Sequence, residues 1–137
     1  MTLRPILFAA VAVVAAGFLV QGQAGAQTAA AAPPAGDPAK GQALFAANCS
    51  TCHTDAKVST DSTTLSLFGI VGRKSGSNAD FSYSPAMTNA NIVWTPDKLF
   101  AYLENPPAVV PGNVMYFPGL PDAADRANVI AYLSTLK

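Results

Sequence analysis

Apolar side chains recur at helical spacing at both ends of the region that follows residue 36. The Asp37-Pro38 pair supplies an N-cap carboxylate and a proline at the first helical position, which predicts a helix over 38–48. Gly41 and Phe45 lie one turn apart on this helix, and a glycine there permits another helix to approach closely. A second helix is predicted over 122–136, with an apolar stripe at Val129, Leu133 and Leu136. We expect this stripe to pack against the Gly41/Phe45 face.

Between these two helices the pattern is mostly irregular. Residues 54–94 are rich in Ser, Thr, Asn, Asp and Gly without a sustained period, so we expect loops and one short helical turn that begins at Ser84-Pro85. Thr95-Pro96 begins a third helix, and Asn105-Pro106-Pro107 ends it because the residue before a proline avoids the α region. A further loop, punctuated by proline and glycine, is expected over 109–121. Loops of this length in so short a domain require something else to fill the core.

The first 36 residues have a different composition. Arg4 precedes a predominantly apolar run over 5–20, and the small residues Ala24-Gly25-Ala26 follow, which is the pattern of a secretory signal. We expect cleavage after Ala26, a disordered Ala/Pro-rich lead-in over 27–36 and one folded domain over 37–137. An uncleaved membrane anchor is the alternative, although the apolar run is shorter than the roughly 20 residues that span a bilayer.

The charge of the chain excludes some partners. Beyond residue 26 there are seven Lys/Arg and eight Asp/Glu, which give a formal charge near −1. These charges form no basic tract that would bind nucleic acid or an anionic membrane surface.

One short cluster, Cys49-Ser50-Thr51-Cys52-His53, carries the chemistry. The C-x-x-C-H spacing is that of c-type haem attachment, in which both thiols form thioether bonds to the haem and the adjacent imidazole becomes an iron ligand. A structural zinc site needs about four Cys/His ligands, and the chain has these three. A disulfide leaves the histidine unexplained, and a thioredoxin-like pair needs a βαβ context that the pattern lacks.

An iron held by His53 needs a second ligand or an open site. The chain has no other histidine, and Met87 and Met115 are the methionines beyond the apolar N-terminal segment. Met87 lies in a predicted helical turn, where a methionine often fills a gap in the core, whereas Met115 lies in the irregular loop. A thioether ligand stabilises reduced iron and raises the reduction potential.

Further blocks follow the haem motif in order: Gly72–Gly76, Phe81–Tyr83, Trp94, Tyr102–Pro106, Pro111–Met115 and Asp125–Leu133. With these blocks, residues 37–137 resemble the class I c-type cytochromes, specifically the soluble bacterial relatives of mitochondrial cytochrome c. The resemblance implies an all-α cytochrome c fold, with three main helices, a short helical turn and long loops wrapped around one haem c attached through Cys49 and Cys52.

The resemblance also implies roles on the two sides of the iron. His53 is expected to be the proximal ligand and Met115 the distal ligand. The hydroxyl of Tyr102 is expected near the Met115 sulfur. Asn113 takes the place of a threonine that the family usually has near that ligand.

Other implied roles concern the haem propionates and the loop below the haem. Tyr83 and Trp94 are expected to donate hydrogen bonds to a buried propionate, and Arg73 to offset its charge, since a buried carboxylate is costly unless it is paired. Leu65 replaces a family proline whose carbonyl accepts from the proximal histidine; the carbonyl survives, but a source of loop rigidity is lost. Met87 replaces an asparagine of a water network beneath the haem.

The expected docking surface also departs from the family. Mitochondrial-type cytochromes surround the exposed haem edge with lysines, whereas none of the corresponding residues here is basic: Asn48, Pro107, Ala108, Val114, Pro121 and Asp122. The neighbouring loop is apolar, with Val109, Val110, Val114, Tyr116 and Phe117. We therefore predict docking through a small apolar patch, with association rates that depend weakly on salt.

The sequence thus predicts a periplasmic, monomeric, single-haem electron carrier that is not an enzyme. The expected donor is a quinol-cytochrome c reductase type complex or a periplasmic dehydrogenase, and the expected acceptor a terminal oxidase, a reductase or a photosynthetic centre. Three alternatives stay open: a haem protein that binds gas or peroxide at an open iron, a membrane-tethered electron-transfer module, and a dithiol oxidoreductase.

Overall fold

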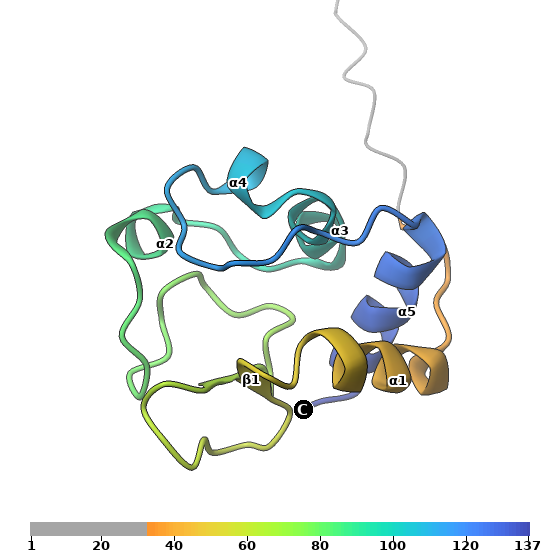
Figure 1. The fold of residues 1–137 in the computed structure, drawn as a ribbon, viewed down its shortest axis with the longest axis horizontal. Helices are drawn as coiled ribbons and strands as arrows, with labels where there is room; N and C mark the ends of the chain where they lie inside the picture. The colour runs from red at the N-terminus through yellow and green to blue at the C-terminus, as the bar shows by residue number, and fades with distance from the viewer. Residues whose placement is uncertain (1–32) are drawn as a thin grey trace, which may run out of the picture.

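The computed structural model describes residues 33–137. The predicted signal over 1–26 and most of the predicted lead-in lie outside the described residues. Three longer helices, two short helices and a pair of two-residue strands make up the regular structure of the described part (Figure 1): α1 (Pro38–Asn48), β1 (His53–Thr54), β2 (Leu65–Ser66), α2 (Pro85–Asn89), α3 (Pro96–Glu104), α4 (Pro106–Val109) and α5 (Ala123–Leu133). No helix within residues 33–137 is both long and apolar enough to cross a membrane.

Most of the helices begin where the sequence predicts, with polar caps. The Asp37 carboxylate accepts a hydrogen bond from the Ala39 N–H at 2.9 Å, and the Asp122 carboxylate accepts from the Ala124 N–H at 2.6 Å. The Ser84 hydroxyl accepts from the Met87 N–H at the start of α2. Each cap satisfies a backbone donor that has no partner inside its helix.

Helix α4 is absent from the sequence prediction, which ends a helix at this point and begins none. The prolines at 106 and 107 end α3 as expected, but they also occupy the first turn of a new helix, where a proline needs no N–H partner. Asn105 caps this helix, since its side-chain oxygen accepts from the Ala108 N–H at 3.3 Å. The predicted loop over 109–121 therefore starts one residue later than expected, and Val110 is buried rather than exposed.

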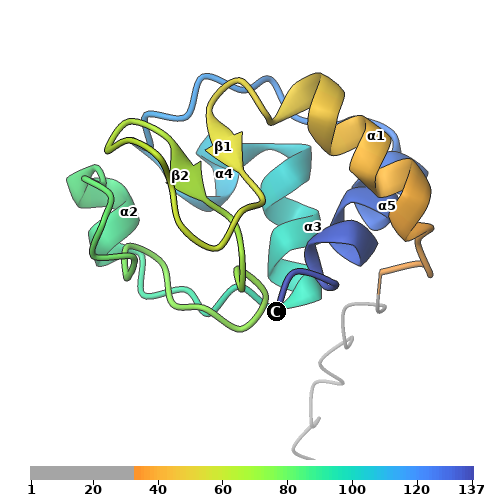
Figure 2. The ribbon, with the colours of Figure 1, turned by 90° about the horizontal axis from the view of Figure 1, so that it is seen from below.

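Helices α1 and α5 cross at very close range. A Cβ atom placed on Gly41 would lie 1.9 Å from the backbone oxygen of Asn128, so only glycine fits at the crossing. The ring of Phe45 packs on that of Tyr132, with the centroids 5.6 Å apart. The two helices lie against each other in both ribbon views, which confirms the predicted partner of the Gly41/Phe45 face (Figures 1 and 2).

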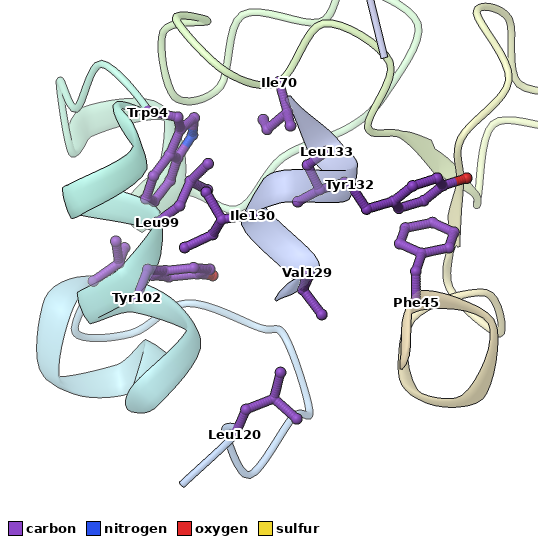
Figure 3. Close-up of a cluster of buried hydrophobic side chains, with 11 residues drawn as sticks. Phe45, Ile70, Trp94, Leu99, Tyr102, Leu120, Val129, Ile130, Tyr132 and Leu133 are labelled. Atoms are coloured by element: carbon purple, nitrogen blue, oxygen red, sulfur yellow. The ribbon is translucent and has the colours of Figure 1, made fainter. Parts of the chain in front are cut away.

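The core continues from this crossing to α3. Figure 3 shows side chains of α5 between Phe45 of α1 on one side and the Trp94, Leu99 and Tyr102 side chains on the other. Trp94 and Tyr102 are in contact, with ring centroids 4.8 Å apart. Helices α1, α3 and α5 therefore form a frame along one side, and the loops between α1 and α3, with the short helix α2, lie on the other side (Figure 2).

Candidate haem-binding site

The helical frame and the loops surround one cavity of about 320 Å³. Its lining comes from segments spread along the chain between Phe45 and Leu133. The long helices contribute Phe45, Leu99, Val129 and Leu133 to this lining. Their helical spacing in the sequence predicts buried positions, but it does not show that these residues border a cavity. None of the residues that line the cavity is a lysine, arginine, aspartate or glutamate. Such a site is suited to a large apolar group.

The cysteines of the C-x-x-C-H motif lie at the C-terminal end of α1 and border the cavity. Cys49 is the C-cap residue of the helix, and its carbonyl accepts from the N–H groups of Cys52 and His53 at 3.1 and 2.9 Å. This turn brings Cys49, Cys52 and His53 together into the lining of the cavity. Burial raises the pKa of the Cys49 thiol to about 11, whereas a thiol-disulfide catalyst needs a lowered thiol pKa. Cys49 is therefore not activated as a nucleophile.

His53 is held as a neutral imidazole. Its Nδ1 atom lies 3.4 Å from the carbonyl oxygen of Leu65, an atom that can only accept, so the proton belongs on Nδ1 and Nε2 keeps its lone pair. Burial lowers the pKa of His53; the Leu65 carbonyl acts in the opposite direction and the charge of Arg73 lowers it again. Strands β1 and β2 pair His53 with Leu65, which brings this carbonyl to the ring despite the absence of the family's proline.

Met115 lines the same cavity from the segment after α4. In Figure 1, β1 and the following loop lie at the bottom, and the segment after α4 lies at the top. The Tyr102 hydroxyl is 3.8 Å from the Met115 sulfur, and burial raises the pKa of Tyr102 to about 12, so this hydroxyl stays a donor. The Asn113 side chain accepts from the Met115 N–H at 3.0 Å and donates to the Val110 carbonyl at 2.8 Å. Asn113 thus fixes the backbone that carries the sulfur.

The three residues expected near the propionates are placed differently from one another. Trp94 and Tyr83 line the cavity, and burial raises the pKa of Tyr83, which keeps its hydroxyl protonated. Arg73 does not line it. The Arg73 guanidinium donates to the carbonyl oxygens of Ser66 at 2.9 Å and Phe68 at 3.3 Å. Its positive charge lies outside the cavity lining, but it is close enough to lower the pKa of both Tyr83 and His53.

Sequence reasoning missed one polar contact beside the site. The Tyr132 hydroxyl of α5 donates a hydrogen bond to the carboxylate of Asp55, two residues after His53. Thr54, between them, accepts from the Leu67 N–H at 2.8 Å. The segment that carries His53 is therefore tied to α5 on one side and to β2 on the other. No local pattern marks this contact, because its partners are distant in the sequence.

The residues present fit a haem attached to the chain. Two free thiols, a neutral imidazole with one nitrogen available and a thioether border one apolar cavity, and together they supply attachment points and both kinds of axial ligand. A zinc site made of protein side chains alone is not assembled within residues 33–137, where no group of three or more His, Cys, Asp or Glu is placed to hold a metal ion.

Comparisons with known proteins agree with this chemistry. The cytochrome c family model matches residues 38–137. The chain is 51% identical over 106 residues to cytochrome c2 of Rhodopila globiformis, an alignment that covers 77% of this chain and 98% of the relative. It is 50% identical over 100 residues to cytochrome c of Theileria annulata (73% and 86% covered) and 44% identical over 106 residues to cytochrome c2 of Rhodomicrobium vannielii (77% and 84% covered). The chain belongs to the cytochrome c family, and it is a single-haem electron carrier with haem c attached through Cys49 and Cys52, not an enzyme.

Proposed function

We propose that this cytochrome works outside the cytoplasm, in the periplasm, after cleavage at Ala26, and that it moves as a monomer between larger redox complexes. The signal pattern of residues 1–26 supports export. Covalent haem attachment in bacteria takes place outside the cytoplasm, which requires the same route. The donor is a quinol-cytochrome c reductase type complex or a periplasmic dehydrogenase, and the acceptor is a terminal oxidase, a reductase or a photosynthetic centre.

In this proposal His53 and Met115 are the two axial ligands. The observation that carries it is the meeting of both side chains in one uncharged cavity, although they come from distant parts of the sequence. Tyr102 donates to the Met115 sulfur, and Asn113 fixes the Met115 backbone. These contacts favour a sulfur that stays in place in both oxidation states.

Tyr83, Trp94 and Arg73 hold the propionate end of the haem. Tyr83 and Trp94 line the cavity and each carries a hydrogen-bond donor, while Arg73 adds positive charge from outside the lining. Because Arg73 donates to two loop carbonyls, it acts at a distance and also fixes the loop. This charge lowers the cost of burying a carboxylate.

The haem supplies a metal centre that gains and loses one electron. The contribution of the chain is to attach the group, to hold two ligands rigidly, to exclude water with apolar side chains and to leave one edge accessible to partners.

The test compares two methionines that line the same cavity. In Met115→Ala, the oxidised haem protein is expected to lose the far-red sulfur-to-iron absorption band, its reduction potential is expected to fall, and its reduced form is expected to bind carbon monoxide rapidly. In Met87→Ala, the matched control, the band is expected to persist. Both proteins are purified with haem and examined by absorption spectroscopy and redox titration.

The alternatives give different results. A wild-type protein without the band, whose reduced form binds carbon monoxide rapidly, would show that the site binds a diatomic molecule or peroxide instead. N-terminal sequencing of the exported protein tests the cleavage separately. A sequence that starts at Met1 would replace the soluble carrier with a tethered one.

A further inference from the structure

The polar contact made by the His53 ring is a long one. The Nδ1 atom lies 3.4 Å from the carbonyl oxygen of Leu65, whereas an N–H···O hydrogen bond usually measures about 2.7–3.2 Å. A contact of this length fixes the proton on Nδ1 but aligns the ring weakly. The orientation of the ring therefore depends on how the backbone that carries it is held.

Strand β2 gives this backbone no independent support, because β1 and β2 belong to one loop. The two strands pair with each other, and the Leu67 N–H donates to the Thr54 carbonyl at 2.8 Å. Bonds of this kind let the two strands move together as one unit. The Gly69 N–H donates to the Leu136 carbonyl at 2.8 Å, which holds this unit beyond β2, at the end remote from His53. The end that carries His53 needs a contact of its own with the helical frame.

A carboxylate beside His53 makes that contact. The Tyr132 hydroxyl of α5 donates a hydrogen bond to Asp55, two residues after His53. A hydrogen bond to a charged acceptor is roughly twice as strong as one between neutral groups. Tyr132 is itself well fixed, since it is 7% exposed and its ring packs on Phe45 of α1 (Figure 3). Burial, with a smaller effect of Asp55, raises the pKa of Tyr132 to about 12, so this hydroxyl stays a donor.

We propose that Asp55 is a positioning residue for His53, and that its contact with Tyr132 sets the orientation of the imidazole toward the haem iron. This role rests on the proposed function, in which His53 is an axial ligand. Asp55 does not line the cavity, so it acts through the short backbone segment that joins it to His53. Contacts outside the ligand set commonly fix the orientation of a metal-bound histidine and tune the metal.

The experiment records the haem methyl resonances of the oxidised holo-protein by proton NMR. Their paramagnetic shifts follow the orientation of the axial imidazole plane, whereas a loss of global stability alone leaves them unchanged in the folded protein. Asp55→Ala removes the acceptor. Tyr132→Phe removes the donor and keeps the ring that packs on Phe45. Asp55→Asn keeps a side-chain oxygen that accepts the same hydrogen bond.

Asp61→Ala is the matched control, because it removes a carboxylate of the same loop. The Asp61 carboxylate accepts from the N–H groups of Thr63 and Thr64, both at 2.8 Å, so its hydrogen bonds stay within the loop. The control variant therefore has the same change of charge as Asp55→Ala and also loses loop hydrogen bonds, but it leaves the contact with α5 in place.

Asp55→Ala and Tyr132→Phe are each expected to shift the haem methyl resonances in the same sense, and the double variant is expected to shift them no further. Asp55→Asn is expected to retain most of the wild-type pattern, and Asp61→Ala all of it. The Nδ1 proton of His53 is expected to exchange with solvent about tenfold faster in Asp55→Ala and Tyr132→Phe, because local opening no longer breaks a hydrogen bond to a charged acceptor.

Wild-type methyl shifts in folded Asp55→Ala and Tyr132→Phe would overturn the positioning role. So would a change in Asp61→Ala, or in Asp55→Asn, as large as that in Asp55→Ala. Absorption spectra of the same samples separate this result from a failure of the proposed function. Proteins that keep the far-red sulfur-to-iron band with unchanged methyl shifts refute the positioning role alone, whereas a wild-type protein without the band refutes the assignment of Met115.

Discussion

The crossing of α1 and α5 gives a substitution in which two effects have opposite signs. Gly41→Ala improves the intrinsic helix propensity of α1 by about 1 kcal/mol. The added Cβ would lie 1.9 Å from the Asn128 backbone oxygen and 2.8 Å from the Tyr132 Cβ. Contacts under 3.0 Å force atoms to move, and the first of these is a backbone atom of the opposite helix. The helices must therefore separate by about 1 Å.

That separation weakens every contact across the crossing. Forced overpacking of this kind costs roughly 1–3 kcal/mol. The Phe45–Tyr132 ring contact and the hydrogen bond from the Asp37 N–H to the Asn128 side chain, 2.8 Å long, each add about 1 kcal/mol when they are lost in part. After subtraction of the propensity gain, we expect Gly41→Ala to lower the free energy of unfolding by about 2–4 kcal/mol.

Guanidinium unfolding of the haem protein, followed by circular dichroism, measures this change. Ala46→Gly is the matched control, since it makes the reverse exchange at an exposed position of the same helix and is expected to cost about 1 kcal/mol through propensity. A Gly41→Ala protein as stable as wild type, or more stable, would show that the helices do not meet at this distance.

Three further predictions follow from single contacts. Tyr132→Phe removes the donor to Asp55 and is expected to lower the free energy of unfolding by about 1.5 kcal/mol. Tyr116→Phe, the control, removes an exposed hydroxyl and is expected to change the free energy of unfolding by less than about 0.5 kcal/mol. Equal effects of the two variants in chemical unfolding would refute the Tyr132–Asp55 contact. Burial raises the pKa of Tyr102 from 10.0 to about 12, so its contribution to stability is complete below pH 10 and is lost as the pH rises to about 12. Unfolding of the reduced protein across this range is expected to show a smaller loss in Tyr102→Phe, and an unchanged slope would contradict the assignment. Asn113→Ala removes two hydrogen bonds of the Met115 loop and is expected to cost about 1–2 kcal/mol in the same unfolding assay, with full stability as the contrary result.

The sequence was sufficient for the elements that depend on local chemistry. Asp37, Ser84 and Asp122 begin helices because a short polar side chain caps free N–H groups wherever the chain places it. The Gly41/Phe45 face could also be assigned, because a glycine in a helix is expensive unless something approaches it closely. The haem motif needed only five consecutive residues.

Other features depend on long-range contacts and left no local pattern. Arg126 is a charged residue on α5, yet it is buried, donates to the carbonyl oxygens of Leu120 and Pro121 at 2.7 and 2.9 Å, and stacks 4.4 Å from the centre of the Phe100 ring. Two prolines in a row end one helix and also begin α4, and the sequence alone favoured the first effect. The two-residue strands are too short to show a period.

These long-range contacts explain how irregular segments can hold the two proposed iron ligands, His53 and Met115, with little motion. The segment after His53 is fixed to α5 through Asp55 and Tyr132. The end of the Met115 segment is fixed to α3, where the Leu120 N–H donates to the Leu103 carbonyl at 2.7 Å, and to α5 through Arg126. The His53 loop and the Met115 loop therefore depend on the same helical frame. Loosening the α1–α5 crossing is expected to disturb the His53 loop directly, because Tyr132 of α5 holds Asp55. An electron carrier benefits from such an arrangement, because ligands that stay in place between oxidation states require little rearrangement when the electron moves.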